Sequence, residues 1–301
     1  MPATELSMAE PSTQPEPTGN YEIIIEPSKS WLRINWREMW EYRDLLSILI
    51  RRDFLAKYKQ TVLGPIWFVL QPLLTAVVMS IAFNKIGGID TDGIPSLIFN
   101  LCALLSWSYF SQNITTGAAT FTANSHLFGK VYFPRLVVPA AAAISNLFAL
   151  GLQLIVFLAF FAWYAATGSN VHIGFSALLA IPLFLITGIF SLGVSLLLAA
   201  STAKYRDLSH LTPVLLQLWM FASPVFYPMK KITENATFGW LAWANPMAAV
   251  VEATRDVLLK GGQMSPELPT MLGVSTLAAV LALVLGVIAF NRAERTVVDS
   301  V

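Results

Sequence analysis

Six stretches of this 301-residue chain contain no Asp, Glu, Lys or Arg, and this pattern constrains the fold more than any other feature. Each stretch reaches or approaches the roughly 20 residues that a helix needs to cross a hydrocarbon core about 30 Å thick. All 19 basic and 18 acidic residues lie outside them. The pattern predicts an all-α membrane protein with six transmembrane helices. The expected spans are residues 65–84, 94–117, 136–166, 173–200, 211–228 and 270–290.

The region before the first span divides into two parts. Residues 1–20 are rich in Pro, Ser, Thr and Glu, which predicts a disordered tail. Residues 21–64 place Trp31, Trp36 and Trp40 among charged side chains, a mixture typical of an amphipathic helix at the membrane interface. A small soluble helical hairpin is the alternative. Residues 65–301 then form the six-helix domain.

The basic residues predict the orientation of the chain. If the N-terminus is cytoplasmic, fourteen of the 19 basic residues lie in inside segments and five lie outside. Cytoplasmic segments carry the excess of Lys and Arg, so both termini are expected inside. The five outside residues are Lys85, Lys230, Lys231, Arg255 and Lys260.

The outer segment between spans five and six, residues 229–269, alternates polar stretches with short apolar ones. Neither apolar piece is long enough to cross the membrane. Two short re-entrant helices that meet at Asn245–Pro246 would be tolerated where protein or a water-filled cavity satisfies their backbones. An ordinary surface loop is the alternative.

The sequence carries no recognisable catalytic or nucleotide-binding motif. It contains no G-x-x-x-x-G-K-[ST] motif, so no P-loop can hold a nucleotide. Its three histidines are scattered over separate segments, and Cys102 is the only cysteine, so we expect no metal site. Asp90 and Asp92 form a D-x-D pair, which is read as a solvated turn. A membrane enzyme with these two metal ligands is the alternative.

No acid or base lies inside an expected span. Ionisable groups within the membrane are the usual mark of proton-coupled or sodium-coupled carriers, so their absence counts against such a carrier. What remains is a membrane passage without a source of energy in the same chain.

The sequence contains three runs, at residues 51–74, 124–142 and 204–228, that resemble the permease subunit of polysaccharide-export ABC transporters, the type-2 exporters of O-antigen, capsule and teichoic acid. The resemblance extends from about Trp31 to the C-terminus. It implies a homodimer of six-helix protomers with two copies of a separate cytoplasmic ATPase. ATP and magnesium would then bind to the partner, and this chain would need no cofactor. The runs are RRDFLAKYKQTVLGPIWFVLQPLL at 51–74, NSHLFGKVYFPRLVVPAAA at 124–142 and KYRDLSHLTPVLLQLWMFASPVFYP at 204–228.

The resemblance also implies a cytoplasmic coupling helix at residues 124–135, and the loop at 204–207 is a second candidate for the same contact. A plain basic loop would explain Lys130 and Arg135, but not the apolar residues between them. The expected ATPase-coupling residues are Lys130, Tyr132, Phe133, Pro134, Arg135, Lys204 and Arg206.

A glycan passage can use aromatic rings, because sugars present apolar C–H faces on which rings stack. Ordinary interfacial belts are the competing explanation for each ring. The candidates are Trp67, Trp107, Tyr109, Phe110, Trp219, Phe221, Phe226 and Tyr227, with an outer gate at Trp240, Trp243, Asn245 and Pro246.

Four basic residues before the first span could attract the diphosphate of an undecaprenyl-linked substrate, or simply anionic lipid. They are Arg51, Arg52, Lys57 and Lys59.

The resemblance predicts the transmembrane subunit of an exporter that moves lipid-linked polysaccharide across the bacterial inner membrane. We expect no nucleic-acid partner. Alternatives are a type-2 exporter of a drug or small lipid, and an enzyme acting on glycan-lipid.

Overall fold

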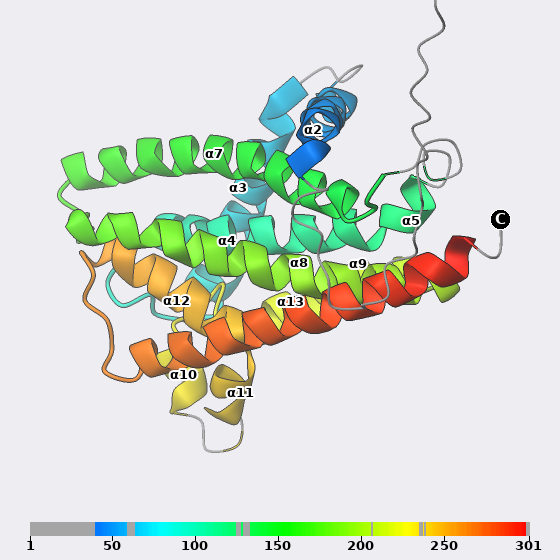
Figure 1. Cartoon of the computed structure of the whole chain (residues 1–301). Coiled ribbons are helices and arrows are strands. Elements are labelled where there is room, and N and C mark those ends of the chain that lie inside the picture. The colour runs from blue at the N-terminus through cyan, green and yellow to red at the C-terminus, as the bar shows by residue number, and fades with distance from the viewer. Residues whose placement is uncertain are drawn as a thin grey trace, which may run out of the picture. The chain divides into compact units, whose positions relative to one another are not determined.

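The computed structural model describes residues 40–58, 64–124, 128, 133–205, 207–234, 237 and 239–298, without the side chains of residues 57–58 and 295–298. All belong to the unit formed by Trp31–Val301. The expected disordered tail and the first part of the interfacial region lie outside the described residues. Within the part described, every regular element is a helix, and the sole β-type pairing is an isolated bridge between His172 and Lys260 (Figure 1).

Four helices are long and apolar enough to cross a membrane, which confirms four of the expected spans. The first, Gly64–Ile86, consists of a 3-10 turn, α3 (Trp67–Met79) and a π-helical end at Ser80–Ile86. The others are α7 (Val137–Ala166), α8 (Ala180–Lys204) preceded by a 3-10 turn at Phe175–Leu179, and α13 (Leu268–Val298). The chain is therefore a multi-pass membrane protein.

The other two expected spans are helical but differ from these four. Helix α4 (Ser96–Ala118) has 23 residues, enough to cross, although it carries several Asn, Gln, Ser and Thr side chains. Helix α9 (Leu208–Ala222) has only 15 residues, which gives a length of about 22 Å. It ends before the expected limit at residue 228 because Pro224 lacks a backbone N–H and forces extended backbone on Ser223, whose ψ is 148°.

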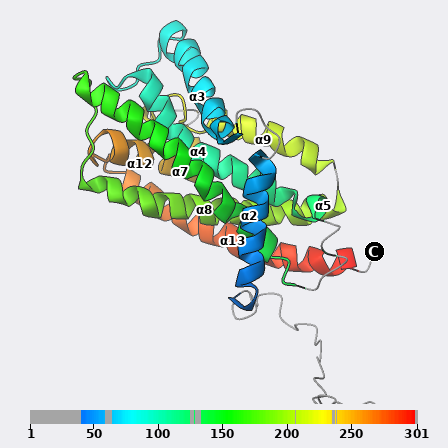
Figure 2. The same cartoon turned by 90° about the horizontal axis from the view of Figure 1, so that it is seen from above.

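Helix α2 (Arg43–Tyr58) confirms a helix within the expected interfacial region. It packs on α7, and Leu49 is buried in a cluster with Phe133, Val137 and Val138 (Figure 2). Trp40 and Ile48 remain 73% and 64% exposed. Its position at the surface of a membrane stays a prediction.

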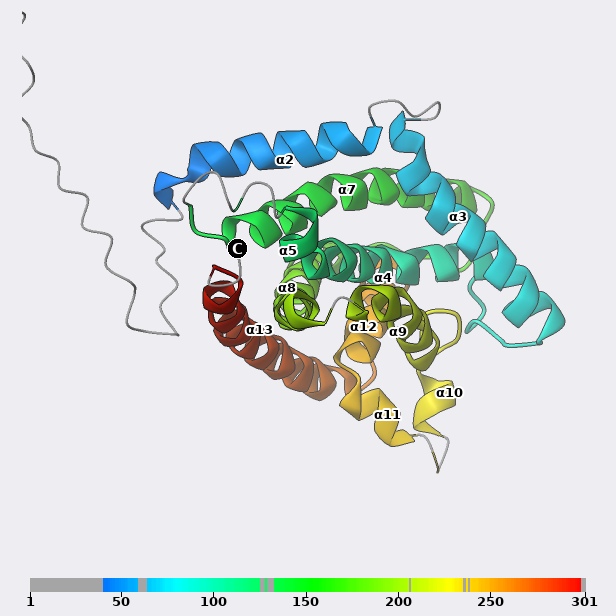
Figure 3. The same ribbon diagram turned by 90° about the vertical axis from the view of Figure 1, so that its right-hand side faces the viewer.

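Helix α4 forms the centre of the described fold. It contacts α7, α8, α12, α3 and α9, and Figure 3 shows it surrounded by them. Residues 98–110 of α4 are all buried. A helix enclosed by protein on most sides can carry polar side chains that would be costly against lipid.

The expected pair of short outer helices is present as α11 (Gly239–Ala244) and α12 (Pro246–Leu259), separated at Asn245. A short α10 (Lys230–Thr233) precedes them. All residues of α12 from Met247 to Leu259 are buried, in contact with α4, α8 and α13. The alternative of an ordinary surface loop is therefore wrong for this segment.

Candidate functional site

An open groove of about 490 Å³ lies between the first turns of α3 and the last turns of α4, with one side chain from α9. Every side chain that lines it is uncharged. The lining residues are Phe68, Gln71, Pro72 and Thr75 of α3, Leu104, Trp107, Ser108, Ser111, Gln112, Thr115 and Thr116 of α4, and Met220 of α9.

Most hydroxyl groups of this groove bond to the helix that carries them. Thr75 Oγ1 donates to the carbonyl of Gln71 at 3.0 Å, and Thr115 Oγ1 donates to that of Ser111 at 2.8 Å. Ser111 Oγ and Thr116 Oγ1 do the same, at 3.2 and 2.7 Å. Small polar side chains at such spacing follow one helix face, so α4 presents a strip of hydroxyl oxygens.

A buried polar network lies behind this strip. Asn146 Nδ2 of α7 donates to Asn113 Oδ1 at 2.8 Å and to Thr116 Oγ1 at 3.2 Å. Asn113 Nδ2 donates to Ser191 Oγ of α8 at 2.9 Å. Polar side chains that form hydrogen bonds between helices hold membrane helices together, so these bonds fix α4, which forms the groove wall, to α7 and α8.

Of the eight aromatic candidates, Trp107 lies in the groove lining. It is only 4% exposed, so it is about as buried as Tyr109, Phe110 and Phe226, which are 5%, 0% and 0% exposed and do not line the groove. Phe110 stacks on Phe190 at 5.4 Å and is 5.4 Å from Trp107, so it supports the groove side chain from behind.

The remaining candidates lie outside the groove lining. Trp67 is 51% exposed at the start of α3, and Phe221 is 37% exposed. Tyr227 donates its hydroxyl to the carbonyl of Phe221 at 2.7 Å. Trp219 packs edge-on against Phe110 at 5.1 Å. A role for any of these rings in the passage stays a prediction.

Asn245 joins the C-terminal end of α9 to the start of α12. Its Oδ1 accepts from the indole Nε1 of Trp219 at 2.9 Å and from Met247 N at 3.1 Å. Its Nδ2 donates to Ser223 Oγ at 2.8 Å and to the carbonyl of Ala222 at 3.2 Å. The Met247 bond is a normal helix N-cap, and Pro246 suits the first helical position. Of the expected gate residues, Asn245 is therefore a structural junction.

Trp240 and Trp243, the other expected gate residues, are 63% and 42% exposed on α11. Their part in a gate stays a prediction.

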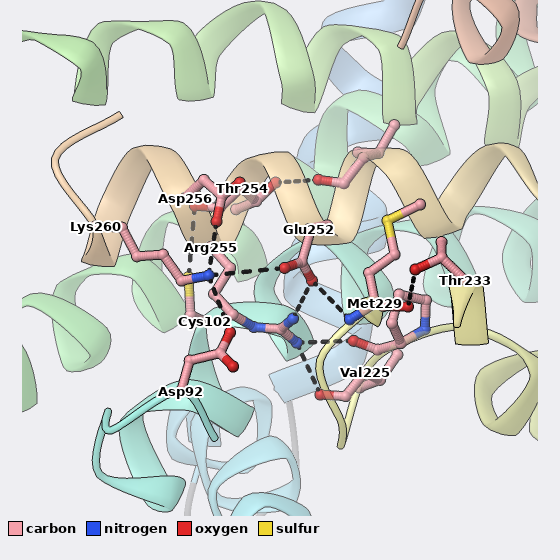
Figure 4. A network of polar contacts seen from close by, with 12 residues as sticks. Asp92, Cys102, Val225, Met229, Thr233, Glu252, Thr254, Arg255, Asp256 and Lys260 are labelled. Carbon is pink, nitrogen blue, oxygen red and sulfur yellow. Dashed lines mark hydrogen bonds and ion pairs between the residues drawn. The ribbon is translucent and has the colours of Figure 1, made fainter. Parts of the chain in front are cut away.

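A buried ionic cluster on α12 was missed by the sequence analysis, which counted Arg255 only as an outside charge. Arg255 exposes none of its side chain. Its Nη1 donates to Glu252 Oε2 at 2.6 Å, and its Nη2 donates to the carbonyls of Pro224 and Val225 at 2.7 and 3.2 Å (Figure 4). The guanidinium also lies 3.7 Å from the ring centre of Phe99 on α4.

The cluster continues toward the C-terminal end of α12. Met229 N donates to Glu252 Oε2 at 3.4 Å. Lys260 Nζ lies 3.1 Å from Asp256, 3.2 Å from Asp92 and 3.8 Å from Glu252. Burial first, and then the Glu252 carboxylate, raise the pKa of Asp256 to about 6 against the opposing Lys260 and Arg255 charges. Asp92, half of the D-x-D pair, is thus paired with a lysine.

Arg135, far from this cluster and just before the start of α7, makes its polar contacts with residues of this same chain. Its Nε lies 3.6 Å from Glu294 Oε1, its Nη1 donates to the carbonyl of Glu294 at 3.3 Å, and its guanidinium lies 5.0 Å from the ring centre of Phe128. Phe133 is buried against α2 and α7, and Pro134 precedes the start of α7. Arg135 therefore attaches the expected coupling segment to α13.

We expect Arg135→Met to loosen the C-terminal turns of α13, because its pairing with Glu294 is only partly exposed and spans two elements. Amide hydrogen exchange in residues 291–298 should become faster. Lys204→Met is the matched control, since Lys204 contacts the Tyr205 ring at 5.1 Å, and should leave this exchange unchanged. Equal exchange in both variants would contradict the attachment.

Of the residues expected to bind the substrate headgroup, one is exposed and another is hydrogen-bonded within the chain. Arg51 is exposed on α2, whereas Arg52 Nη2 donates to Asp53 Oδ1 at 2.8 Å and to Asn124 Oδ1 at 3.1 Å. Among the residues outside the described part are Lys59, Lys130, Tyr132 and Arg206, together with the side chain of Lys57. Their expected roles stay predictions.

The four helices that are long and apolar enough to cross a membrane are those of a multi-pass membrane protein. A family model described as "ABC-2 type transporter" matches residues 44–259. The chain belongs to this family of permeases, which are transport subunits without a catalytic domain and work with an ATPase subunit. This confirms the family-level resemblance of the sequence.

Similar proteins carry a more specific name. The chain is 28% identical over 249 residues to an "O-antigen export system permease protein RfbA" of Myxococcus xanthus, covering 81% of this chain and 91% of that protein. It is 30% identical over 224 residues to a protein of the same name from Klebsiella pneumoniae, covering 72% and 81%. A second Klebsiella pneumoniae protein of that name is 28% identical over 224 residues, with the same coverage.

Proposed function

We propose that this chain is the permease subunit of an exporter that moves a lipid-linked polysaccharide from the cytoplasm to the outer face of a bacterial inner membrane. The groove between α3 and α4 is the observation that carries the proposal, since it offers uncharged polar side chains and one indole within the membrane domain. The proposed cargo is based on the names of the relatives, which are called O-antigen export system permease proteins. A cargo of O-antigen, capsular or teichoic acid type fits this proposal.

In the proposed topology, α4 and α9 complete six spans, and α11 and α12 return to the outer face without crossing. Both termini are cytoplasmic. The working unit is a homodimer with two copies of a cytoplasmic ATPase, which alone binds ATP and magnesium. The segments around Phe133 and Lys204 receive the ATPase, and the exposed Arg51 of α2 meets the diphosphate of the carrier lipid.

The proposal is tested in proteoliposomes that contain this chain and its ATPase partner. We expect ATP-dependent movement of a lipid-linked glycan to the opposite leaflet. The chain without its partner should neither hydrolyse ATP nor move the glycan, and ATP hydrolysis by the purified chain alone would contradict the proposal. Movement of drugs or single lipids but not of glycan would favour the alternative exporter.

A further inference from the structure

We propose that the groove selects an uncharged, hydroxyl-rich glycan chain and disfavours a polyanionic one. This inference rests on the proposed function and narrows its cargo, since acidic capsules and teichoic acids carry a negative charge on many repeats. It concerns the sugar chain that occupies the groove, and leaves the diphosphate of the carrier lipid to the basic residues of α2.

The hydrogen bonds within the groove wall determine which donors and acceptors remain free for a bound molecule. A hydroxyl group has one hydrogen to donate and two lone pairs that accept. Ser111, Thr115 and Thr116 of α4, and Thr75 of α3, already donate their hydrogens to carbonyls of their own helices. The oxygens of Ser111, Thr115 and Thr75 therefore remain as acceptors for a bound molecule, whereas that of Thr116 already accepts from Asn146. The best partner for such oxygens is a molecule rich in O–H donors.

A neutral glycan is such a molecule, because each sugar ring carries several hydroxyl groups that donate as well as accept. Thr115 is exposed, and Ser111, Gln112 and Thr116 are half-buried, so a chain lying along α4 can reach them. Trp107 lies in the same wall but is only 4% exposed, so it offers a sugar no more than a small part of its apolar surface.

A phosphate or carboxylate group has no hydrogen to donate to these oxygens when it is ionised. Such groups only accept hydrogen bonds when ionised, so they would face the hydroxyl oxygens acceptor to acceptor. Of the lining side chains, Gln71, Gln112 and Trp107 have N–H groups, and none carries a positive charge. An anion that leaves water without a cation to pair with incurs a large desolvation cost.

The experiment compares two cargoes in proteoliposomes that contain this chain and its ATPase partner. Both are lipid-linked polymers of equal length on the same carrier lipid, and one has a phosphate group on every repeat. We expect the neutral polymer to move about tenfold faster or more, as hydrogen-bonding sites reject mismatched groups at least to this extent. Equal rates, or faster movement of the anionic polymer, would overturn the inference but leave the proposed function standing.

Two variants connect the preference to the groove. Thr115→Val removes an acceptor oxygen while keeping the shape, and should slow the neutral polymer several-fold. Thr276→Val is the matched control: Thr276 is also exposed, also donates to the carbonyl four residues earlier, at 2.8 Å, and lies on α13 away from the groove. It should have no effect. Equal effects of these two variants would overturn the inference.

Gln112→Lys introduces a cation into the wall and should narrow or reverse the preference for the neutral polymer. An unchanged preference in a folded Gln112→Lys protein would also count against the inference. If the wild-type complex moves neither polymer, the proposed function is wrong, and the inference is wrong with it.

Discussion

Arg255→Met is expected to lower the free energy of unfolding by about 3–5 kcal/mol, because it breaks a buried ion pair and leaves Glu252 with only one charged partner, the more distant Lys260 at 3.8 Å. Glu252 is 8% exposed and would lose its bond of 2.6 Å. The carbonyls of Pro224 and Val225 would lose their donor as well. The effect is measured by denaturant unfolding of the purified chain in detergent micelles.

Arg51→Met is the matched control, since it makes the same chemical change at an exposed position of α2 and should alter the unfolding free energy by less than about 1 kcal/mol. The double variant Glu252→Leu with Arg255→Met removes both charges and should regain part of the lost stability. If Arg255→Met unfolds like the wild-type protein, the cluster is not a stabilising element.

The Arg255 cluster also has a consequence for the groove. Arg255 and Glu252 hold the chain between Pro224 and Met229, and Asn245 holds Ala222 and Ser223. The C-terminal end of α9 is thereby fixed to α12, and α9 also supplies Met220 to the groove. Helices α9 and α12 are expected to move as one body if the groove widens during transport.

Spans were predictable from the sequence because the absence of charge over about 20 residues reflects a direct physical requirement of the bilayer. Helix α7 begins and ends within one residue of its expected span. Helix α9 was less predictable, since its end depends on the local effect of Pro224 on Ser223, which apolar composition does not register.

The groove was only partly predictable. Aromatic composition included Trp107, which lines the groove, but it could not separate this ring from Phe110, because the two lie three residues apart on one helix and differ in what packs around them. The spacing of Ser108, Ser111 and Thr115 is a helical signal that could have indicated the polar face of α4.

The ionic cluster on α12 could also have been recognised from the spacing of its residues. Counting the charges of each segment predicts orientation but does not take their spacing into account. Glu252, Asp256 and Lys260 recur at intervals of four residues, and Arg255 lies three residues after Glu252, in a mostly apolar helix that has Lys260 as its C-cap. Such spacing indicates ion pairs along one face. Burial of that face could not be predicted, because it depends on α4, whose Phe99 lies more than 150 residues away in the sequence.

Gly193→Ala should lower the free energy of unfolding by about 1–3 kcal/mol, because α8 and α13 approach each other too closely for a methyl group. A Cβ atom at Gly193 would overlap the backbone of Ala282 and Leu283, and one at Gly286 would overlap the carbonyl oxygen of Gly193. Small residues of this kind let membrane helices pack backbone to backbone. Neither helix can shift alone, since α8 also packs on α4 and α13 on α12.

Gly273→Ala gives a control with the opposite expected sign. Gly273 lies on α13 with no heavy atom within 4 Å of an added Cβ, so alanine meets open space. Alanine is favoured over glycine inside a helix by about 0.5–1 kcal/mol, so this variant should match or exceed the wild-type stability. Denaturant unfolding of both variants in the same micelles decides the matter. Equal changes in stability would mean that the α8–α13 crossing tolerates a methyl group, and that the glycines do not set the distance between these helices.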